Sequence, residues 1–595
     1  MPELSESITA IREGAKEDPF TYLTILQYHV STPGILPTLN QVLQNADLTR
    51  EIGWDLVQTL VAVDGCEECL ETVARLGNPR EVIIKVMETM AALAGRLGEA
   101  RDDTAEGASS LSPSLAVIPD RLITLISMLA ILQRRIKTKH SSRFLGPSSV
   151  AVLEAYQPTP EMTTAVINLV RSLSGRIRPP LPTRTSSIDV ANPDEHGDGS
   201  KNAPDPEAEQ EDPEEVNLNR KLLQSFTTCV IQRFVNVHEM QWAPRLFEVY
   251  HPEKVVPGKT TTTKAFREDE ILQKRDAVIG QLMALLRDLD MDDFSADFVR
   301  RTVCQQSDID PVTALQTFDS ADDIRLSQGG IACLIAYWIF STDAFGADNP
   351  DPQMHLFPEH LSMLQLFLGA EPQVEIGRNP GIADALLAIG LGLHHRGLIA
   401  ATGDEKNYMV YHHCLTLIAV FHPNIQTRNA ATMFAGALLH SDPDDESRRD
   451  ILEDLLQNCQ FPALNACAIK WLQEEIISAR NGNFSNAFSG PDVIERLQYD
   501  LFPDARSVSK MDDGDFLGYW AENQTFLLQA ANFAYFLFNG RKDLVPVGVG
   551  ASVERRFAEP LTAAAMKLGK AGGLDGHDRM QLDILVDRLE SLDIR

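Results

Sequence analysis

Long hydrophobic runs are missing from this chain of 595 residues. A membrane-spanning helix needs about 18 consecutive apolar residues or more, and the longest candidate, residues 331–340 (IACLIAYWIF), is clearly shorter. The first residues (MPELSESITAIREGAKEDPF) also lack the basic and apolar regions of a secretory signal. We therefore expect a soluble protein in the cytoplasm, with the nucleus as a second location and no contact with a membrane.

Positive charge is also scarce. The 53 Lys and Arg residues face 84 Asp and Glu residues, which gives a formal net charge of −31. A broad nucleic-acid-binding surface needs clustered Lys and Arg side chains, so this balance argues against direct binding to nucleic acid. A strongly acidic chain stays soluble and attracts partners with basic segments.

Signatures of catalysis and of cofactor binding are absent from the sequence. No GxSxG, GxxxxGK[ST] or HExxH motif and no paired-carboxylate pattern occurs. The 8 cysteines are scattered rather than arranged as a disulfide framework, which fits a reducing compartment. We predict no enzymatic activity, no cofactor and no metal site.

A helix–turn–helix pattern is present around residue 78. Gly77 suits the position that follows a helix end, and the side chain of Asn78 can accept a hydrogen bond from the start of the next helix. Pro79 then takes the first helical position, where its missing N–H costs nothing. Glu81 takes the third position and completes a capping-box pattern. These four residues predict a tight structural junction between two helices.

Helical periodicity extends over most of the chain. Apolar residues recur at spacings of three and four, for example at 82, 83, 86, 90 and 93. In the later part, pairs of helices joined by a Pro-containing turn recur roughly every 40 residues, in the style of HEAT or armadillo repeats. Runs that alternate with period 2 are almost absent. The sequence predicts an all-α, HEAT/armadillo-like helical solenoid.

An acidic, proline-rich stretch interrupts the helical pattern. Residues 179–218 have little to bury and so cannot offset the entropy of ordering, which predicts a disordered linker. It separates an N-terminal helical repeat region, 1–178, from a C-terminal helical repeat region, 219–595. A solvated spacer is the favoured interpretation of the linker, and a phosphorylated regulatory segment around Ser186 and Ser187 is the alternative.

Cys66 and Cys69 form a CxxC motif that is the one candidate for redox chemistry. A cysteine in the first turn of a helix has a lowered thiol pKa. Glu67, Glu68 and Glu71 oppose thiolate formation by like charge, and no second cysteine pair completes a zinc site. Core packing is therefore the favoured interpretation, with a redox role as the alternative.

Two histidine doublets, His394-His395 and His412-His413, are the remaining candidates for metal ligation. Neighbouring residues on a helix point in different directions, so each doublet offers at most one good ligand to a shared site. A supporting Asp or Glu at helical spacing is absent. We interpret these histidines as structural.

Residues 53–57 (GWDLV) and 76–82 (LGNPREV) carry a family resemblance. Together with the order of helical part, acidic linker and long helical part, they resemble the YAP-binding/ALF-four/glomulin family, closest to its fungal YAP-binding branch. A later block, residues 411–431, is compatible but less specific. The resemblance covers most of the chain outside the linker and implies an all-helical, HEAT-like fold without known catalysis.

The functions that this resemblance implies differ between branches. Fungal members are associated with a basic-leucine-zipper factor of the peroxide response, assisting its oxidation and nuclear accumulation. This implies a non-enzymatic adaptor of the oxidative-stress response, whose partner is that transcription factor or its peroxidase. The alternatives are a glomulin-like regulator that binds the RING subunit of cullin ubiquitin ligases and a kinetochore-associated scaffold. A nuclear transport receptor ranks below them, and no motif marks the partner-binding face.

Overall fold

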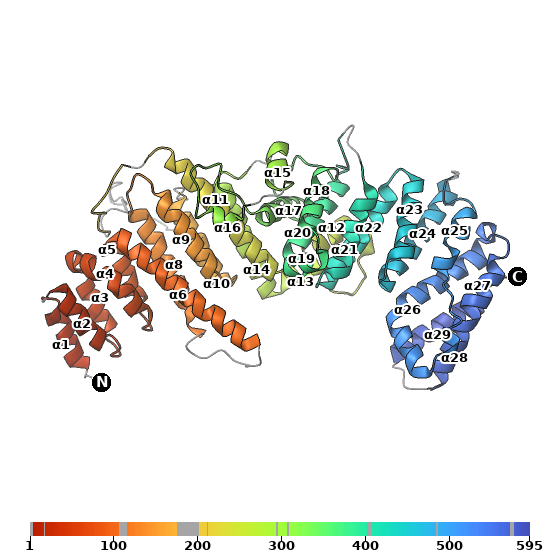
Figure 1. Ribbon diagram of the computed structural model, residues 1–595, viewed down its shortest axis with the longest axis horizontal. Coiled ribbons are helices and arrows are strands. Elements are labelled where there is room, and N and C mark those ends of the chain that lie inside the picture. The colour runs from red at the N-terminus through yellow and green to blue at the C-terminus, as the bar shows by residue number, and fades with distance from the viewer. Residues whose placement is uncertain are drawn as a thin grey trace, which may run out of the picture. The chain divides into compact units, whose positions relative to one another are not determined.

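The computed structural model describes residues 4–16, 18–105, 116–174, 202–210, 212–292, 295–305, 309–401, 406–482, 486–571 and 576–594. Within these ranges the chain forms helices and turns without any β-strand, and one isolated bridge joins Phe357 to Ala400. No described helix is long and apolar enough to cross a membrane. The prediction of an all-α helical solenoid is confirmed (Figure 1).

The first part of the chain, up to residue 345, contains helices of very different length. They are α1 (Leu4–Gly14), α2 (Pro19–His29), α3 (Leu36–Leu43), α4 (Ala46–Val61), α5 (Glu67–Leu76), α6 (Pro79–Ala105), α8 (Ile118–Arg135), α9 (Ser142–Ala155), α10 (Pro160–Leu173), α11 (Glu215–Val237), α12 (Trp242–Tyr250), η1 (Pro252–Lys254), α13 (Thr262–Glu268), α14 (Glu270–Asp288), α15 (Ala296–Thr302), α16 (Pro311–Ala314) and α17 (Gln328–Phe345).

The second part adds the helices that follow residue 358, with short 3₁₀ and π-helical turns between some of them. They are α18 (Glu359–Leu368), α19 (Pro372–Arg378), α20 (Pro380–His395), α21 (Tyr408–Phe421), α22 (Ile425–Ser441), α23 (Asp445–Asn458), α24 (Pro462–Gly482), α25 (Asp492–Leu501), η2 (Val508–Lys510), α26 (Asp513–Tyr535), η3 (Phe536–Gly540), η4 (Lys542–Leu544), α27 (Val549–Val553), η5 (Glu554–Ala558), α28 (Glu559–Ala571) and α29 (Gly576–Glu590).

These helices fall into two compact units. The first contains Met1–Trp242, Pro252–Gln353 and Asp384–Leu386, and the second contains Ala243–His251, Met354–Ala383 and Leu387–Arg595. The first unit therefore continues past the predicted linker. The physical reason is that α11 packs against α9, α10 and α17 of the same unit.

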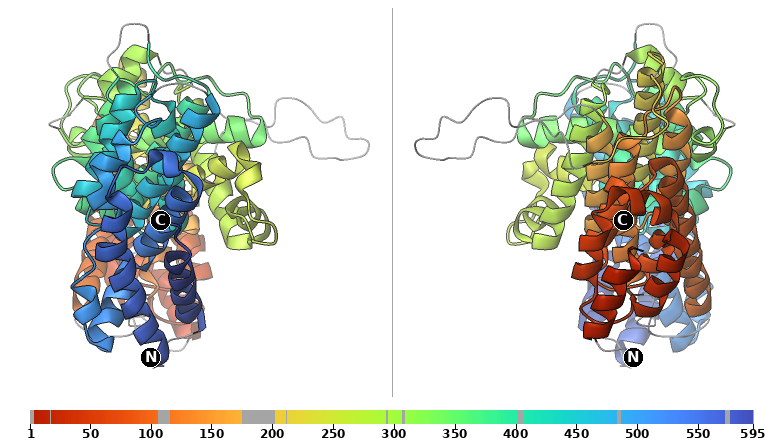
Figure 2. Two further views of the ribbon diagram at one scale, coloured as in Figure 1. Left: turned by 90° about the vertical axis from the view of Figure 1, so that its right-hand side faces the viewer. Right: turned by 90° about the vertical axis from the view of Figure 1, so that its left-hand side faces the viewer.

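The first unit is built by stacking each helix on its near neighbours in the chain. α4 contacts α5 and α6, α5 and α6 contact α8, and α8 contacts α10 (Figure 1; red to orange in the right-hand view of Figure 2). Every one of these helices buries one apolar face, as α8 does with Leu122, Leu125 and Leu129. This arrangement of neighbour on neighbour is that of a solenoid.

The second unit follows the same rule. α21 contacts α22 and α23, α24 contacts α22, α23 and α26, and α26 packs with α28 and α29 (blue in the left-hand view of Figure 2). The largest fully buried side chains here are aromatic and include Tyr411, Phe434, Phe502, Trp520 and Phe533. The core of this unit therefore combines aromatic rings with aliphatic side chains such as those of Leu415, Leu439 and Leu472.

The predicted linker, residues 179–218, differs from the structure in its second half. Residues 202–210 and 212–214 run along the ends of helices in the first unit, and α11 begins at Glu215. The carboxylate of Asp205 is fully buried. The entropy cost of ordering this segment is offset by ion pairs and hydrogen bonds rather than by apolar burial. Its composition, which is poor in apolar residues, therefore predicts disorder where the structure shows a docked segment. Ser186 and Ser187 lie outside the described residues.

A histidine held by two carboxylates joins α22 to α24 in the second unit. Nδ1 of His440 lies 2.6 Å from Oε1 of Glu475, and Nε2 lies 3.0 Å from Oε2 of Glu474. Arg448 donates from Nε to the second carboxylate oxygen of Glu475 at 3.0 Å. Burial disfavours the charged imidazole, but the hydrogen bonds to the two glutamates outweigh it and raise the pKa of His440.

We expect this histidine to make the stability of the second unit depend on pH. Because the pKa is raised by folding, the stabilisation is complete below the ordinary value of about 6.5 and is lost as the pH rises through the folded value. The difference in thermal midpoint between the wild type and His440→Gln should therefore shrink as the pH rises across this range. His413→Gln, at an exposed position on α21, is the control. A difference that stays constant with pH would contradict the assignment.

Candidate functional site

The junction predicted around residue 78 connects α5 to α6. α5 ends at Leu76, and Oδ1 of Asn78 accepts a hydrogen bond from the backbone N–H of Arg80 at 3.2 Å. Pro79 is the first residue of α6. Glu81 is exposed, and within the described chain its carboxylate makes no hydrogen bond, so the reciprocal half of a capping box is not formed.

Gly77 differs from the prediction in its backbone conformation. Its φ of −65° and ψ of 170° are extended rather than left-handed, so any residue could adopt them. Space is the constraint, because a β-carbon there would lie 2.8 Å from the carbonyl oxygen of Val73. A β-carbon on Gly53 of α4 would in turn lie 3.4 Å from Cα of Gly77. The two sequence segments that carry the family resemblance therefore touch each other.

The CxxC motif lies at the start of α5 and is buried. Cys66 precedes the first helical residue, and Sγ of Cys69 lies 3.5 Å from the carbonyl oxygen of Leu36. Burial, with the negative charge of Glu67, raises the pKa of Cys66 to about 11. Burial, with the neighbouring Cys66 and Glu68, raises the pKa of Cys69 to about 12. Both are free thiols, and at neutral pH both are protonated and therefore weak nucleophiles.

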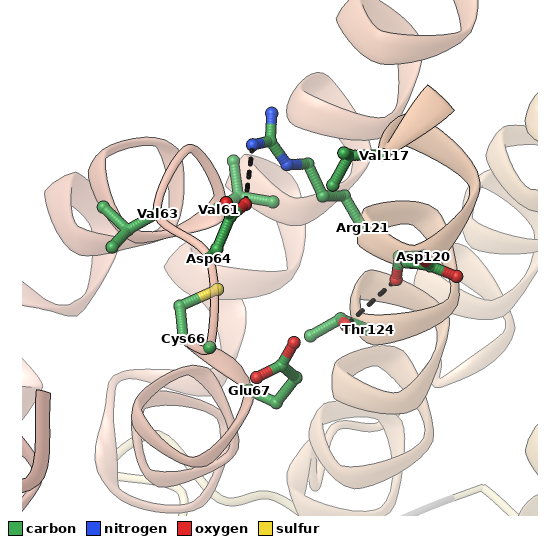
Figure 3. A pocket seen from close by; sticks show the side chains of 10 residues that line it. Val61, Val63, Asp64, Cys66, Glu67, Val117, Asp120, Arg121 and Thr124 are labelled. Carbon is green, nitrogen blue, oxygen red and sulfur yellow. Dashed lines mark hydrogen bonds and ion pairs between the residues drawn. The ribbon is translucent and has the colours of Figure 1, made fainter. Parts of the chain in front are cut away.

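A small pocket of about 240 Å³ opens beside Cys66, between the α4–α5 turn and α8 (Figure 3). In Figure 3 the guanidinium of Arg121 points toward Asp64, and its Nη2 donates to Oδ1 of Asp64 at 3.5 Å and to the carbonyl of Ala62 at 3.1 Å. Asp64, Glu67 and Asp120 give the lining three carboxylates against one guanidinium. Burial is the main cause of the raised pKa of Cys66, and the charges of Glu67 and Asp64 add to it against the opposing effect of Arg121.

A second group of charged side chains lies at the α5–α6 junction. Its basic residues belong to α6 and α8, and its acidic residues belong to the predicted linker. Arg80 at the start of α6 donates from Nε to the buried Oδ2 of Asp205 at 3.3 Å. Its Nη1 lies 2.9 Å from Oε2 of Glu207, and its Nη2 donates to the carbonyl of Glu207. The same Asp205 oxygen accepts the backbone N–H of Lys137 at 3.0 Å. One arginine of the junction is thus bound by two acidic residues of the linker segment.

Arg135, the last residue of α8, is buried beneath the same segment. Its Nη1 donates to the carbonyl of Ala74 at 2.6 Å and its Nη2 to that of Gly77 at 2.8 Å, so it caps the end of α5. Its Nε donates to the carbonyl of Ala203 at 3.0 Å. Burial lowers the pKa of Arg135 to about 10, against the opposing effect of Asp205. The guanidinium therefore stays charged at neutral pH.

The segment is fixed again where it enters α11. Oε2 of Glu215 accepts the backbone N–H of Ser142, the first residue of α9, at 2.9 Å, and Oε1 lies 3.3 Å from Nδ1 of His140. Asn219 donates from Nδ2 to Oγ of Ser141 at 2.6 Å. A carboxylate at a helix N-terminus is favoured by the helix dipole, so Glu215 ties α11 to the start of α9.

The comparisons with known proteins agree with these features. A family model described as an uncharacterised protein family, YAP/Alf4/glomulin, matches residues 1–587. The chain belongs to the YAP/Alf4/glomulin family. The comparison with curated proteins finds no match. The predicted resemblance is confirmed at the level of the family, and a regulatory or adaptor role follows from it.

The histidine doublets of this YAP/Alf4/glomulin protein belong to the second unit. His412 is buried with its ring edge against Trp471, and burial lowers its pKa to about 3. His395 stacks on Tyr250 with ring centroids 3.9 Å apart. Within the described ranges, no group of three or more His, Cys, Asp or Glu side chains is placed to hold a metal ion.

Sequence reasoning missed the charged groups that this family member brings together at the junction. Arg80, Arg135 and Asp205 were not predicted as site residues. A usable signal exists, because residues 134–143 (RRIKTKHSSR) hold five basic residues and no acid in a chain of net charge −31. Such a basic run predicts an acidic segment that pairs with it, and Asp205, Glu209 and Glu215 belong to that segment.

Proposed function

We propose that this protein is a non-enzymatic adaptor of the oxidative-stress response, which binds a basic-leucine-zipper transcription factor and promotes its peroxide-dependent activation. The observation that supports an adaptor is the docked segment itself: helix ends of the first unit hold a stretch of chain without helix or strand through backbone and side-chain contacts. Stacked helices offer extended surfaces suited to such binding. The net charge of −31 also favours a partner with a basic region.

The two buried thiols bear on which protein carries out the oxidation step of such activation. Because the pKa values of Cys66 and Cys69 are about 11 and 12, neither thiol is poised to react with peroxide. The proposed role is therefore to hold the factor close to a peroxidase that performs the oxidation. Cytoplasmic and nuclear locations both fit this role.

Affinity purification of the full chain, with and without peroxide, tests the proposal. We expect mass spectrometry to find a leucine-zipper factor or its peroxidase, enriched after peroxide treatment. A Cys66→Ser/Cys69→Ser variant should capture the same partners to the same extent, and loss of capture would restore a redox role for the motif. Recovery of cullin and RING subunits alone would overturn the proposal in favour of a ubiquitin-ligase regulator, and kinetochore proteins alone would favour a scaffold.

A further inference from the structure

We propose that the basic surface, defined as Arg80, Arg135, Lys137 and Lys139, is a docking site for an acidic peptide of a partner protein. In this structure the chain's own residues 203–210 and Asp212 occupy it. The inference rests on the proposed adaptor role only for the existence of a partner. The geometry of the surface supplies the chemistry that the partner must offer.

The backbone of the docked segment donates three hydrogen bonds to carbonyls of the first unit, on both sides of a turn at Asp205–Ala208. The N–H of Ala203 donates to the carbonyl of Arg75 at 3.0 Å, that of Glu209 to Lys137 at 2.8 Å, and that of Asp212 to Lys139 at 3.2 Å. Main-chain hydrogen bonds of this kind give affinity without regard to sequence. Selectivity must therefore come from the side chains.

Carboxylates at alternate positions supply that selectivity. Asp205 accepts from Arg80 and from the backbone of Lys137, and Glu207 pairs with Arg80 at 2.9 Å. Oε2 of Glu209 lies 3.4 Å from the backbone N of Lys139, which donates to it. An Asp-x-Glu-x-Glu pattern thus meets the guanidinium of Arg80 and the backbone N–H groups of Lys137 and Lys139.

The docked segment contributes almost no apolar burial, which makes its attachment reversible. Among residues 202–210 only Asp205 is buried. The helices beneath keep a core of their own, with Val73, Val82 and Leu129 fully buried. Glu207 and Glu209 are exposed, and their contacts are individually weak and screened by salt. Asp205 is buried against Arg80, and both charges return to water when the segment leaves. The segment can therefore leave while the stacked helices stay folded.

Competition with the chain's own segment sets the expected affinities. The segment continues directly into α11 at Glu215, so its local concentration at the basic surface is of millimolar order. A free peptide must overcome this advantage and will bind the wild type poorly. Removing the carboxylates of the chain's own segment lowers the advantage and should expose the site.

A fluorescent peptide with the sequence of residues 202–215 (NAPDPEAEQEDPEE) tests the inference on the full chain at low salt. We expect Glu207→Gln/Glu209→Gln and Asp205→Asn/Glu207→Gln variants to bind the peptide at least about tenfold more tightly than the wild type. Added salt should weaken this binding, and Arg80→Ala in the variant background should abolish it. The first variant changes only exposed side chains, so its fold is secure.

A scrambled peptide of equal composition is the matched control, and circular dichroism confirms that each variant is folded. Equal binding of the scrambled peptide, or equal binding to wild type and variants, would overturn the inference. So would the absence of binding to a folded Glu207→Gln/Glu209→Gln variant, because the segment would then be a permanent part of the fold. The partner purification described above is independent of this measurement, so the two proposals can fail separately.

Discussion

Replacing Arg135 with alanine should destabilise the first unit by about 3 kcal/mol, because buried carbonyls that lose their donor each cost roughly 1–3 kcal/mol. The guanidinium donates to the carbonyls of Ala74, Gly77 and Ala203 at once. The loss should be local to the end of α5 and the start of α6.

Hydrogen–deuterium exchange is the suitable measurement, since a chain of two units does not unfold in one step. Peptides covering α5, α6 and residues 203–210 should exchange faster in Arg135→Ala, while peptides of α26 and α28 should be unchanged. Arg135→Lys should be intermediate, because lysine keeps the charge but not the planar fork of donors.

The control is Arg143→Ala, which removes an exposed arginine of the same basic run, residues 134–143, at the start of α9. Exposed substitutions usually change stability by less than about 0.5 kcal/mol. If Arg143→Ala and Arg135→Ala accelerated exchange equally, the loss of positive charge rather than of the buried donors would be responsible. If neither accelerated it, the docked segment would not depend on Arg135.

The local features of the junction could be predicted from the sequence because their causes lie within a few residues. Asn78 bonds the backbone of Arg80, two positions away, and the periodicity of apolar residues around Val82 follows from one helix face. The all-helical fold could be predicted for a similar reason, because the repeats of a solenoid pack mainly on their neighbours in the chain. The family match agrees with this prediction.

The docked segment could not be predicted in the same way. The donors of Arg135 reach carbonyls 58 to 68 positions away, and Arg80 meets Asp205 across 125 positions. The segment has few apolar residues, which predicts disorder, but its order depends on charged contacts with basic residues elsewhere in the chain. The left-handed conformation predicted for Gly77 is not formed, since its backbone is extended and its constraint is the space left by the carbonyl of Val73 and the side chain of Val82.

A second large effect is expected at Gly330, in the first turn of α17. A β-carbon there would lie 2.1 Å from the carbonyl oxygen of Thr228 on α11, and that atom belongs to the backbone and cannot rotate away. The contact is fixed on both sides, because the N–H of Ser327 donates to Oγ1 of Thr228 at 3.1 Å and Oγ of Ser327 accepts from the N–H of Gly330 at 3.0 Å. Gly330→Ala must therefore push α17 away from α11.

We expect Gly330→Ala to cost about 3 kcal/mol, at the upper end of what overpacking normally costs. Faster hydrogen exchange in α11 and α17 is the readout. The matched control is Gly95→Ala in α6, where a β-carbon would meet nothing within 4 Å and alanine should stabilise the helix by about 0.5–1 kcal/mol. Helix propensity alone predicts that both substitutions increase stability. A loss of stability in Gly330→Ala together with a gain in Gly95→Ala would show that the contact between α11 and α17 outweighs propensity. Stabilisation by both would mean that the two helices can separate at little cost.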